Sequence, residues 1–172
     1  MNVAYINPFI ESVNELFTTM LGCAAERGRV GLVKPGEPSG DLTALIGLSG
    51  PVRGTVALSF PDTTALAMVG RMTGLPEAEL ADSLGDGLAE LVNIVAGGAK
   101  AKLNSGSGAV TDLSLPTVVR GQNYAVQGLT QTTWLDVPFA SELGTFTLRV
   151  TLEQTTAQTE PIGAGAGEGR HS

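Results

Sequence analysis

An amphipathic pattern between residues 84 and 103 constrains the fold of this chain more than any other feature. Four aliphatic side chains recur at helical spacing and would share one side of a helix; they are Leu84, Leu88, Leu91 and Val95. Asp86, Glu90 and Asn93 follow one another at i, i+4 and i+7, which places them on one stripe of roughly the opposite side. The pattern therefore predicts a helix, roughly 30 Å long, with one buried face and one polar face.

Three features of this helix have structural explanations as well as functional ones. The polar stripe would face solvent on any amphipathic helix, whatever the protein does. Ser83 precedes Asp86 by three residues, which resembles a capping box and would place the start of the helix there. Gly97 prolongs the polar stripe without a side chain and would let a partner approach closely, whereas close packing inside the protein would account for Gly97 and Gly98 equally well. Periodicity alone does not decide between these explanations.

Two further helices are predicted before this one. In the first, Asn7 and Pro8 resemble an N-cap and a first helical residue, and Gly22 marks the expected end. Its expected buried stripe consists of Phe9, Val13, Leu16, Phe17 and Met20. A second helix is predicted from residue 62 to about residue 72, closed by Gly74.

The remaining periodic segments alternate as strands do. The predicted strands cover residues 28–33, 42–48, 56–60, 129–139 and 146–152. The second and third of these strands form a hairpin around Gly50 and Pro51, and Asp136 and Arg149 are interpreted as ordinary surface charges. Grouped strands separated by helices indicate an α/β sandwich, in which an antiparallel-rich mixed sheet packs against long helices.

The composition indicates one globular domain followed by a tail. The chain has 172 residues, of which 42% are hydrophobic and 16% charged, enough for one sizeable core. From about Thr155 onward, Thr, Gln, Gly, Ala and Glu predominate, and such a segment buries too little apolar area to order itself. We therefore expect a domain over residues 1–154 and a disordered tail over residues 155–172.

Charge and motif content exclude several classes of function. The net charge of −7 and the pI near 4.6 argue against a nucleic-acid partner or an anionic membrane. The sequence lacks zinc-type Cys/His spacing, a phosphate-binding P-loop and a Gly-x-Ser-x-Gly motif. The single cysteine, Cys23, is expected to be a small buried residue and not a nucleophile. Neither a signal peptide nor an apolar run of eighteen residues is present, so a cytoplasmic protein is expected.

The polar stripe also carries a resemblance to a known family. Asp86, Glu90 and Asn93 are followed, after twenty-two residues, by Pro116; this spacing resembles the active-site signature of the CheC, CheX and FliY family of chemotaxis phosphatases. Residues 5–11, 19–22 and 115–119 resemble CheX in particular. The similarity extends from residue 1 to about residue 153, and the fold of the family is the α/β sandwich expected above.

This resemblance implies a reaction, a partner and roles for individual residues. The reaction is hydrolysis of the aspartyl phosphate on a CheY-like response regulator. Asn93 would orient the attacking water, Glu90 would dock on the regulator's active-site Lys, and Asp86 and Pro116 would support them. The protein would need no cofactor or metal of its own, because the regulator supplies Mg²⁺. CheX-like proteins pair through their sheets, so the resemblance also implies a homodimer.

A second Glu-x-x-Asn pair, Glu11 and Asn14, lies on the polar side of the first predicted helix. CheC-like members have two active sites, but here residue 7 is Asn in place of Asp or Ser, and Pro38 lies one residue beyond the expected position. The sequence thus favours a single site. Two alternatives to catalysis stay open, namely a noncatalytic module that binds a regulator or flagellar-switch component, and a scaffolding domain.

Overall fold

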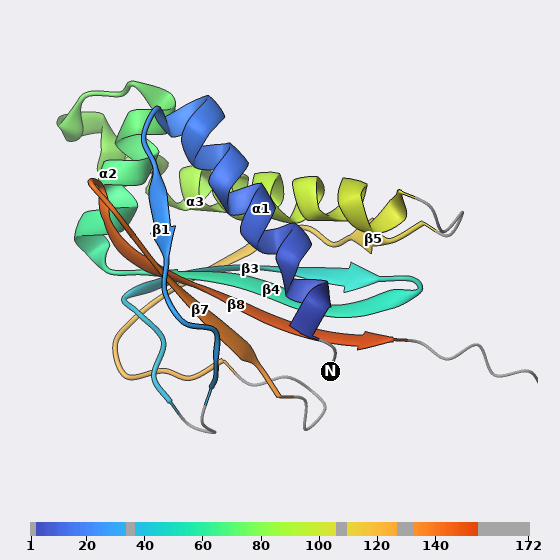
Figure 1. Ribbon diagram of the computed structural model, residues 1–172. Coiled ribbons are helices and arrows are strands. Elements are labelled where there is room, and N and C mark those ends of the chain that lie inside the picture. The colour runs from blue at the N-terminus through green and yellow to red at the C-terminus, as the bar shows by residue number, and fades with distance from the viewer. Residues whose placement is uncertain (1–2, 34–36, 106–109, 127–132, 155–172) are drawn as a thin grey trace, which may run out of the picture.

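An antiparallel sheet with its helices packed on one face forms the fold of this protein (Figure 1). The computed structural model describes residues 3–33, 37–105, 110–126 and 133–154. The expected α/β sandwich is confirmed. The predicted tail, residues 155–172, lies outside the described residues, as does the beginning of the strand predicted over residues 129–139.

Eight strands form the sheet in the described part of the chain. They are β1 Ala25–Arg27, β2 Gly31–Leu32, β3 Leu42–Ser49, β4 Val52–Phe60, β5 Asp112–Leu113, β6 Thr117–Arg120, β7 Leu135–Ser141 and β8 Gly144–Gln154. Their order is β1-β7-β8-β4-β3-β5, with β2 also on β7 and β6 also on β3, and every pairing among them is antiparallel. The predicted hairpin is confirmed as β3 and β4. Of the strand predicted over residues 28–33, only β2 is observed, and β1 lies just before the predicted range.

The helical segments are η1 Val3–Ile6, α1 Asn7–Leu16, η2 Phe17–Leu21, α2 Asp62–Thr73 and α3 Glu77–Asn104. The N-cap of α1 is Ile6 and not Asn7 as predicted, because the 3-10 turn η1 leads directly into the helix. The segment ends at Gly22, as expected, with a left-handed backbone (φ 67°) that glycine adopts without strain. No helix of the described chain is long and apolar enough to cross a membrane.

The predicted buried stripe of the first helix is wrong at one residue, Met20. Met20 is 45% exposed, whereas Leu21 is buried. The cause is η2, a π-helical turn, which has more residues per turn than an α-helix and shifts the buried position from Met20 to Leu21.

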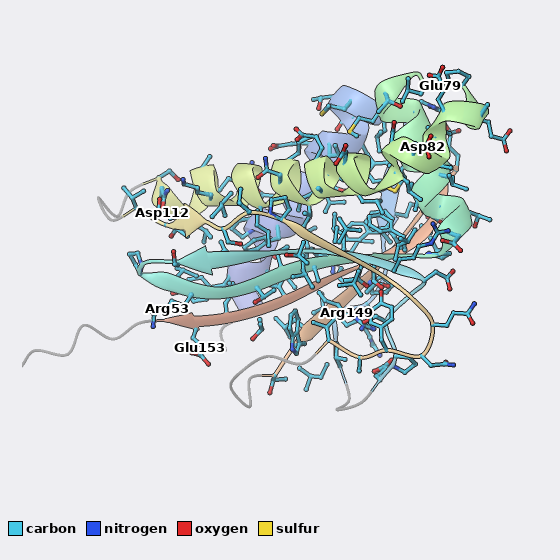
Figure 2. The ribbon with its side chains drawn as sticks, turned by 180° about the vertical axis from the view of Figure 1, so that it is seen from behind. Arg53, Glu79, Asp82, Asp112, Arg149 and Glu153 are labelled. Atoms are coloured by element: carbon cyan, nitrogen blue, oxygen red, sulfur yellow. The ribbon has the colours of Figure 1, made fainter. Side chains whose placement is uncertain are left out.

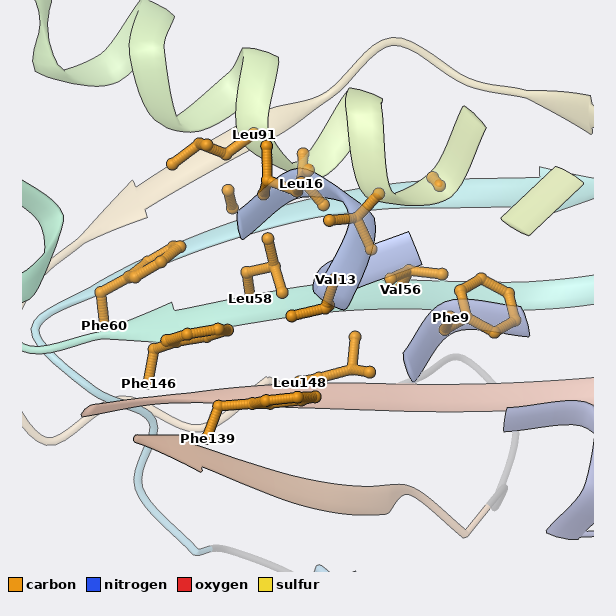
Figure 3. Packing of buried hydrophobic residues seen from close by; sticks show 14 of the residues in the cluster. Phe9, Val13, Leu16, Val56, Leu58, Phe60, Leu91, Phe139, Phe146 and Leu148 are labelled. Carbon is orange, nitrogen blue, oxygen red and sulfur yellow. The ribbon is translucent and has the colours of Figure 1, made fainter. Parts of the chain in front are cut away.

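The core lies between the helices and one face of the sheet (Figure 3). Every second residue of the central strands points into it, as the alternation predicts. Four aromatic rings stack at its centre: the ring of Phe146 on β8 lies 5.2 Å from Phe139, 5.8 Å from Phe60 and 5.5 Å from Phe17 between centroids. This packing fixes α1 and η2 on the sheet and provides the base on which α3 rests.

The prediction that Asp136 and Arg149 are ordinary surface charges is wrong. They face each other in register on β7 and β8, with Nε of Arg149 3.5 Å from Oδ1 of Asp136 and side chains only 12% and 25% exposed for Arg149 and Asp136. Burial raises the pKa of Asp136, and the neighbouring guanidinium of Arg149 opposes that rise. The pair lies on the sheet face opposite the helices, because its neighbours Val137 and Leu148 point into the core.

Candidate functional site

The helix α3 carries the predicted polar stripe and begins earlier than predicted. It has 28 residues and starts at Glu77, so it is about 42 Å long. Pro76 precedes it in an extended conformation, and no side chain caps its first turn. Ser83 and Asp86 lie well inside the helix, so the capping-box interpretation of these two residues is wrong.

The two predicted faces of α3 are confirmed. Leu88 and Leu91 are fully buried against the core, while Asp86, Glu90 and Asn93 are all exposed. Within the described part of the chain, the side chains of Glu90 and Asn93 have no hydrogen bond or ion pair. A carboxylate and a carboxamide, one helical turn apart, are therefore available to another molecule.

The segment of residues 112–120, here called the edge segment, runs beside α3 at the margin of the sheet (Figure 2). It contains β5 and β6, both of which pair with β3 and contact α3. At one end of it, Oδ1 of Asp112 lies 4.0 Å from Nζ of Lys100. The edge segment then runs back toward the N-terminal end of α3.

The edge segment brings Pro116 to the level of the polar stripe. Asp112 is paired with Ser49 and Thr117 with Leu45, so Pro116 lies about three strand residues, or about 10 Å, beyond Asp112 along the sheet, which corresponds to about seven residues of helix. Counted back from Lys100, this places the half-buried Pro116 level with the turn that carries Glu90 and Asn93. Glu90, Asn93 and Pro116 thus lie at about the same level along α3, and Asp86 lies one turn further toward the N-terminus of α3.

The glycines of α3 differ in what surrounds them. A Cβ at Gly87 would lie 2.4 Å from a side-chain carbon of Val69, and one at Gly98 would lie 2.3 Å from the Ser12 hydroxyl. These two glycines are explained by close packing against α2 and α1. A Cβ at Gly97 would meet nothing within 4 Å, so the packing of this protein does not require glycine there.

Two carboxylates that the sequence analysis did not include extend the stripe toward the N-terminus of α3. Glu79 and Asp82 are exposed (Figure 2) and lie on the same helical face as Asp86 and Glu90. We call these four residues the acidic stripe; it covers about 16 Å of the helix. No ion pair within the described chain neutralises any of the four. The sequence signal for this extension is the run of acidic residues that follows Pro76, which precedes the predicted start of the helix at residue 84.

The second Glu-x-x-Asn pair lies on α1. Glu11 and Asn14 are both exposed, and the proline closest in sequence to the position expected for this pair is Pro38. Pro38 lines a cavity of about 620 Å³ together with Ser59 and Arg149, on the sheet face opposite the helices. The structure therefore places Pro38 and the α1 pair on different sides of the sheet.

Among the described residues, few other side chains are of the kinds that commonly act as catalytic groups or metal ligands. Among them, no three His, Cys, Asp or Glu side chains are grouped so that they could hold a metal ion. Cys23 is half-buried, and its pKa is raised, mainly by burial and also by the carboxylate of Glu142. A thiol of raised pKa is a poor nucleophile. The exposed amide and carboxylate on α3 are suited instead to orienting a water molecule and binding a cation.

Comparison with known proteins identifies the family. Residues 42–140 match the family described as chemotaxis phosphatase CheX. The chain belongs to the CheX family. A curated CheX relative, the CheY-P phosphatase CheX of Thermotoga maritima, is 32% identical over 128 residues, which cover 74% of this chain and 82% of the relative.

Solved CheX structures share the fold. Chemotaxis protein CheX from Desulfovibrio desulfuricans is 25% identical and superposes with a TM-score of 0.79, covering 88% of this chain and 100% of its own. The CheX chain of the CheX-CheY-BeF₃-Mg²⁺ complex from Borrelia burgdorferi is 22% identical with a TM-score of 0.74, covering 89% of this chain and 100% of its own. At that lower identity, the likeness concerns the fold alone.

Proposed function

We propose that this protein is a phosphatase that hydrolyses the aspartyl phosphate of a CheY-like response regulator. The observation that carries the proposal is the pair on α3: Asn93 is exposed and lacks a partner in the described chain, and Glu90 lies one turn away. Pro116 lies at about the same level along α3. Membership of the CheX family and the CheY-P phosphatase activity named for the Thermotoga maritima relative support the same reaction.

The proposed role of Asn93 is to position water. An acyl phosphate is already reactive, so placing a water molecule in line with the phosphorus is a sufficient task for the phosphatase. A carboxamide offers both a donor and an acceptor and fixes a water without acting as a strong base. An acceleration of about 100-fold corresponds to about 2.7 kcal/mol of barrier, which orientation alone can supply.

The proposed role of Glu90 is to dock the regulator. Its carboxylate would accept a charge-assisted hydrogen bond from the active-site Lys of the receiver, which sets the position of α3 against the phosphoryl group. Mg²⁺ would be supplied by the receiver. Asp86 and Pro116 would support the two docking elements, Asp86 on the neighbouring turn of α3 and Pro116 through its fixed φ. A partner of this kind is cytoplasmic, and so is the proposed site of action.

We also propose a homodimer that forms through the sheet. The sheet has two margins, at β1 and at the edge segment, and unpaired margins are templates for another strand. Light scattering after size-exclusion chromatography tests this directly, because a dimer has twice the mass of the chain. A single monomer peak at all micromolar concentrations would contradict it.

The decisive experiment is the decay rate of a phosphorylated, Mg²⁺-loaded CheY-like receiver. A panel of CheY-type receivers is labelled on the phosphoryl group, and decay is followed with the wild type, with Asn93→Ala and with no added protein. We expect the wild type to accelerate at least one receiver, and Asn93→Ala to lose about 100-fold of that acceleration while still binding.

Three outcomes would contradict the proposal. Full turnover by Asn93→Ala would remove the proposed role of the amide. Binding of a receiver without faster decay would favour the noncatalytic module. The absence of both binding and acceleration across the panel would favour a scaffolding domain.

A further inference from the structure

The edge segment contains an irregularity directly beside the polar stripe. On β3, Leu48 faces Leu113 and Leu45 faces Thr117. Residues 46 and 47 separate the two β3 positions, whereas residues 114, 115 and 116 separate the two positions on the edge segment. The edge segment therefore has one extra residue, which defines a β-bulge. Bulges of this kind occur beside active sites, where they redirect a side chain.

Hydrogen bonds confine the bulge to Leu115 and Pro116. Ser114 is still paired with Gly47: its backbone N–H donates to the Gly47 carbonyl at 2.9 Å, and the Gly47 N–H donates to the Ser114 hydroxyl at 2.8 Å. The same hydroxyl donates to the carbonyl of Leu115 at 3.0 Å. Regular pairing resumes at Thr117. Leu115 and Pro116 thus lie opposite a single residue of β3, between two fixed points.

The bulge turns Leu115 into solvent. Its side chain is 89% exposed, compared with 68% for Leu32 on β2, the next most exposed leucine among the described residues. Leu115 lies three residues beyond Asp112, which is about 10 Å along the edge segment or about seven residues of helix. Counted back from Lys100, it is level with Asn93. An isolated exposed leucine needs no explanation, but the backbone of this one is flanked by hydrogen-bonded positions and lies at the level of the proposed site.

We propose that Leu115 is a docking residue that contacts an apolar patch on the receiver next to its phosphorylated aspartate. This inference rests on the proposed function and adds a specificity-determining contact to it. Because Ser114 and Pro116 fix the backbone on both sides, Leu115 loses little conformational freedom on binding. Its burial under the receiver would hold α3 at the depth at which Asn93 reaches the phosphoryl group, so Leu115 acts on binding and not on chemistry.

The test measures KM and kcat separately. The substrate is the phosphorylated receiver whose decay the wild type accelerates most. We expect Leu115→Asp and Leu115→Ala to raise KM, the alanine variant by about tenfold, with kcat changed less than twofold. Leu115→Met should keep KM within twofold. Leu32→Asp is the matched control, since Leu32 is exposed but lies on β2 at the opposite margin of the sheet, and it should leave both parameters unchanged. Circular dichroism and urea unfolding verify that each variant folds.

A positioning role for Ser114 follows from the same geometry. Ser114→Ala keeps Leu115 but removes the hydrogen bonds that fix the bulge, so KM should rise by a smaller factor than in Leu115→Ala, again with kcat preserved. Unchanged KM in Leu115→Asp, measured where the wild type is active and Asn93→Ala is not, overturns this inference and leaves the proposed function intact. An inactive wild type, or an active Asn93→Ala, overturns the proposed function itself.

Discussion

The two Glu-x-x-Asn pairs of this molecule share a spacing but not an environment. Glu11 and Asn14 on α1 are exposed, as Glu90 and Asn93 on α3 are. The α3 pair has the edge segment beside it, with Pro116 level with the pair. Pro38, the nearest sequence counterpart for the α1 pair, lies on the other face of the sheet. The two pairs therefore differ in whether a second element with a proline lies at their level.

The two pairs also differ in local charge. Next to the α1 pair, Glu15 forms an ion pair with Lys102, with the carboxylate oxygen 2.7 Å from Nζ. The acidic stripe on α3 has no such neutralisation among the described residues. The α3 face therefore presents an unbalanced negative potential, which would attract a cationic side chain of a partner.

Removing each pair in turn should produce the largest difference between the two helices. The double variant Glu90→Ala/Asn93→Ala should reduce receiver dephosphorylation to the receiver's own rate, a loss of about 100-fold or more. The double variant Glu11→Ala/Asn14→Ala should stay within twofold of the wild type. Phosphoryl-label decay under single-turnover conditions measures both. An equal loss in the two variants would mean that the α1 pair is a second site.

The two glutamates alone should differ mainly in docking. Glu90→Ala would remove the proposed charge-assisted contact with the receiver, so KM should rise by about tenfold. Glu90→Gln, which keeps hydrogen-bonding capacity, should show a smaller rise. Glu11→Ala serves as the control for removing an exposed carboxylate from a helix and should leave KM unchanged. Titration with a BeF₃-loaded receiver by calorimetry gives the affinities independently of turnover.

Two glycines of α3 have room for a side chain, and substituting them compares the polar stripe with another part of the helix. Neither Gly97 nor Gly85 would bring a Cβ within 4 Å of another group, so alanine at either position should stabilise the helix by about 0.5 to 1 kcal/mol. Gly97 lies on the polar stripe, and Gly97→Ala should also raise KM a few-fold because the proposed partner would approach there. Urea unfolding and steady-state kinetics separate the two effects. A rise in KM in Gly85→Ala as well would show that the partner contacts a wider face.

Of the changes considered, the salt concentration should have the smallest effect on KM for the receiver. Raising NaCl from 50 to 500 mM screens exposed charges, and KM for the receiver should increase about twofold to threefold through slower association. In the double variant Glu79→Gln/Asp82→Gln, this salt dependence should become weaker while kcat is unchanged. Glu11→Gln should not alter the salt dependence. An identical salt response in the wild type and the Glu79/Asp82 variant would mean that the outer half of the acidic stripe does not face the receiver.

The sequence was sufficient to predict the helices and strands that have strong local signals. The buried and polar faces of α3, the hairpin of β3 and β4, and the helix that ends at Gly74 follow from periodicity and turn residues. The start of α3 at Glu77 was missed because Gly85 and Gly87 weaken the helical signal there. Packing of Gly87 against Val69 overrides that local preference.

Features that depend on the register between strands could not be predicted from the sequence. The ion pair of Asp136 with Arg149 needs β7 and β8 to be aligned in one register, and a shift of one residue would move each side chain to the other face. The bulge at Leu115 likewise exists only relative to β3. For the candidate site, the sequence supplied Glu90, Asn93 and Pro116, whereas the exposure of Leu115 required the pairing of the edge segment.

The position of β8 has a consequence for the synthesis of the protein. Although β8 is the last described strand in sequence, it lies between β7 and β4 and joins the two halves of the sheet. Every residue of the proposed site leaves the ribosome before β8, yet the sheet under α3 stays in two pieces until residues 144–154 emerge. A nascent or truncated chain that ends at residue 141 should therefore be protease-sensitive and should lack the proposed activity on a phosphorylated receiver.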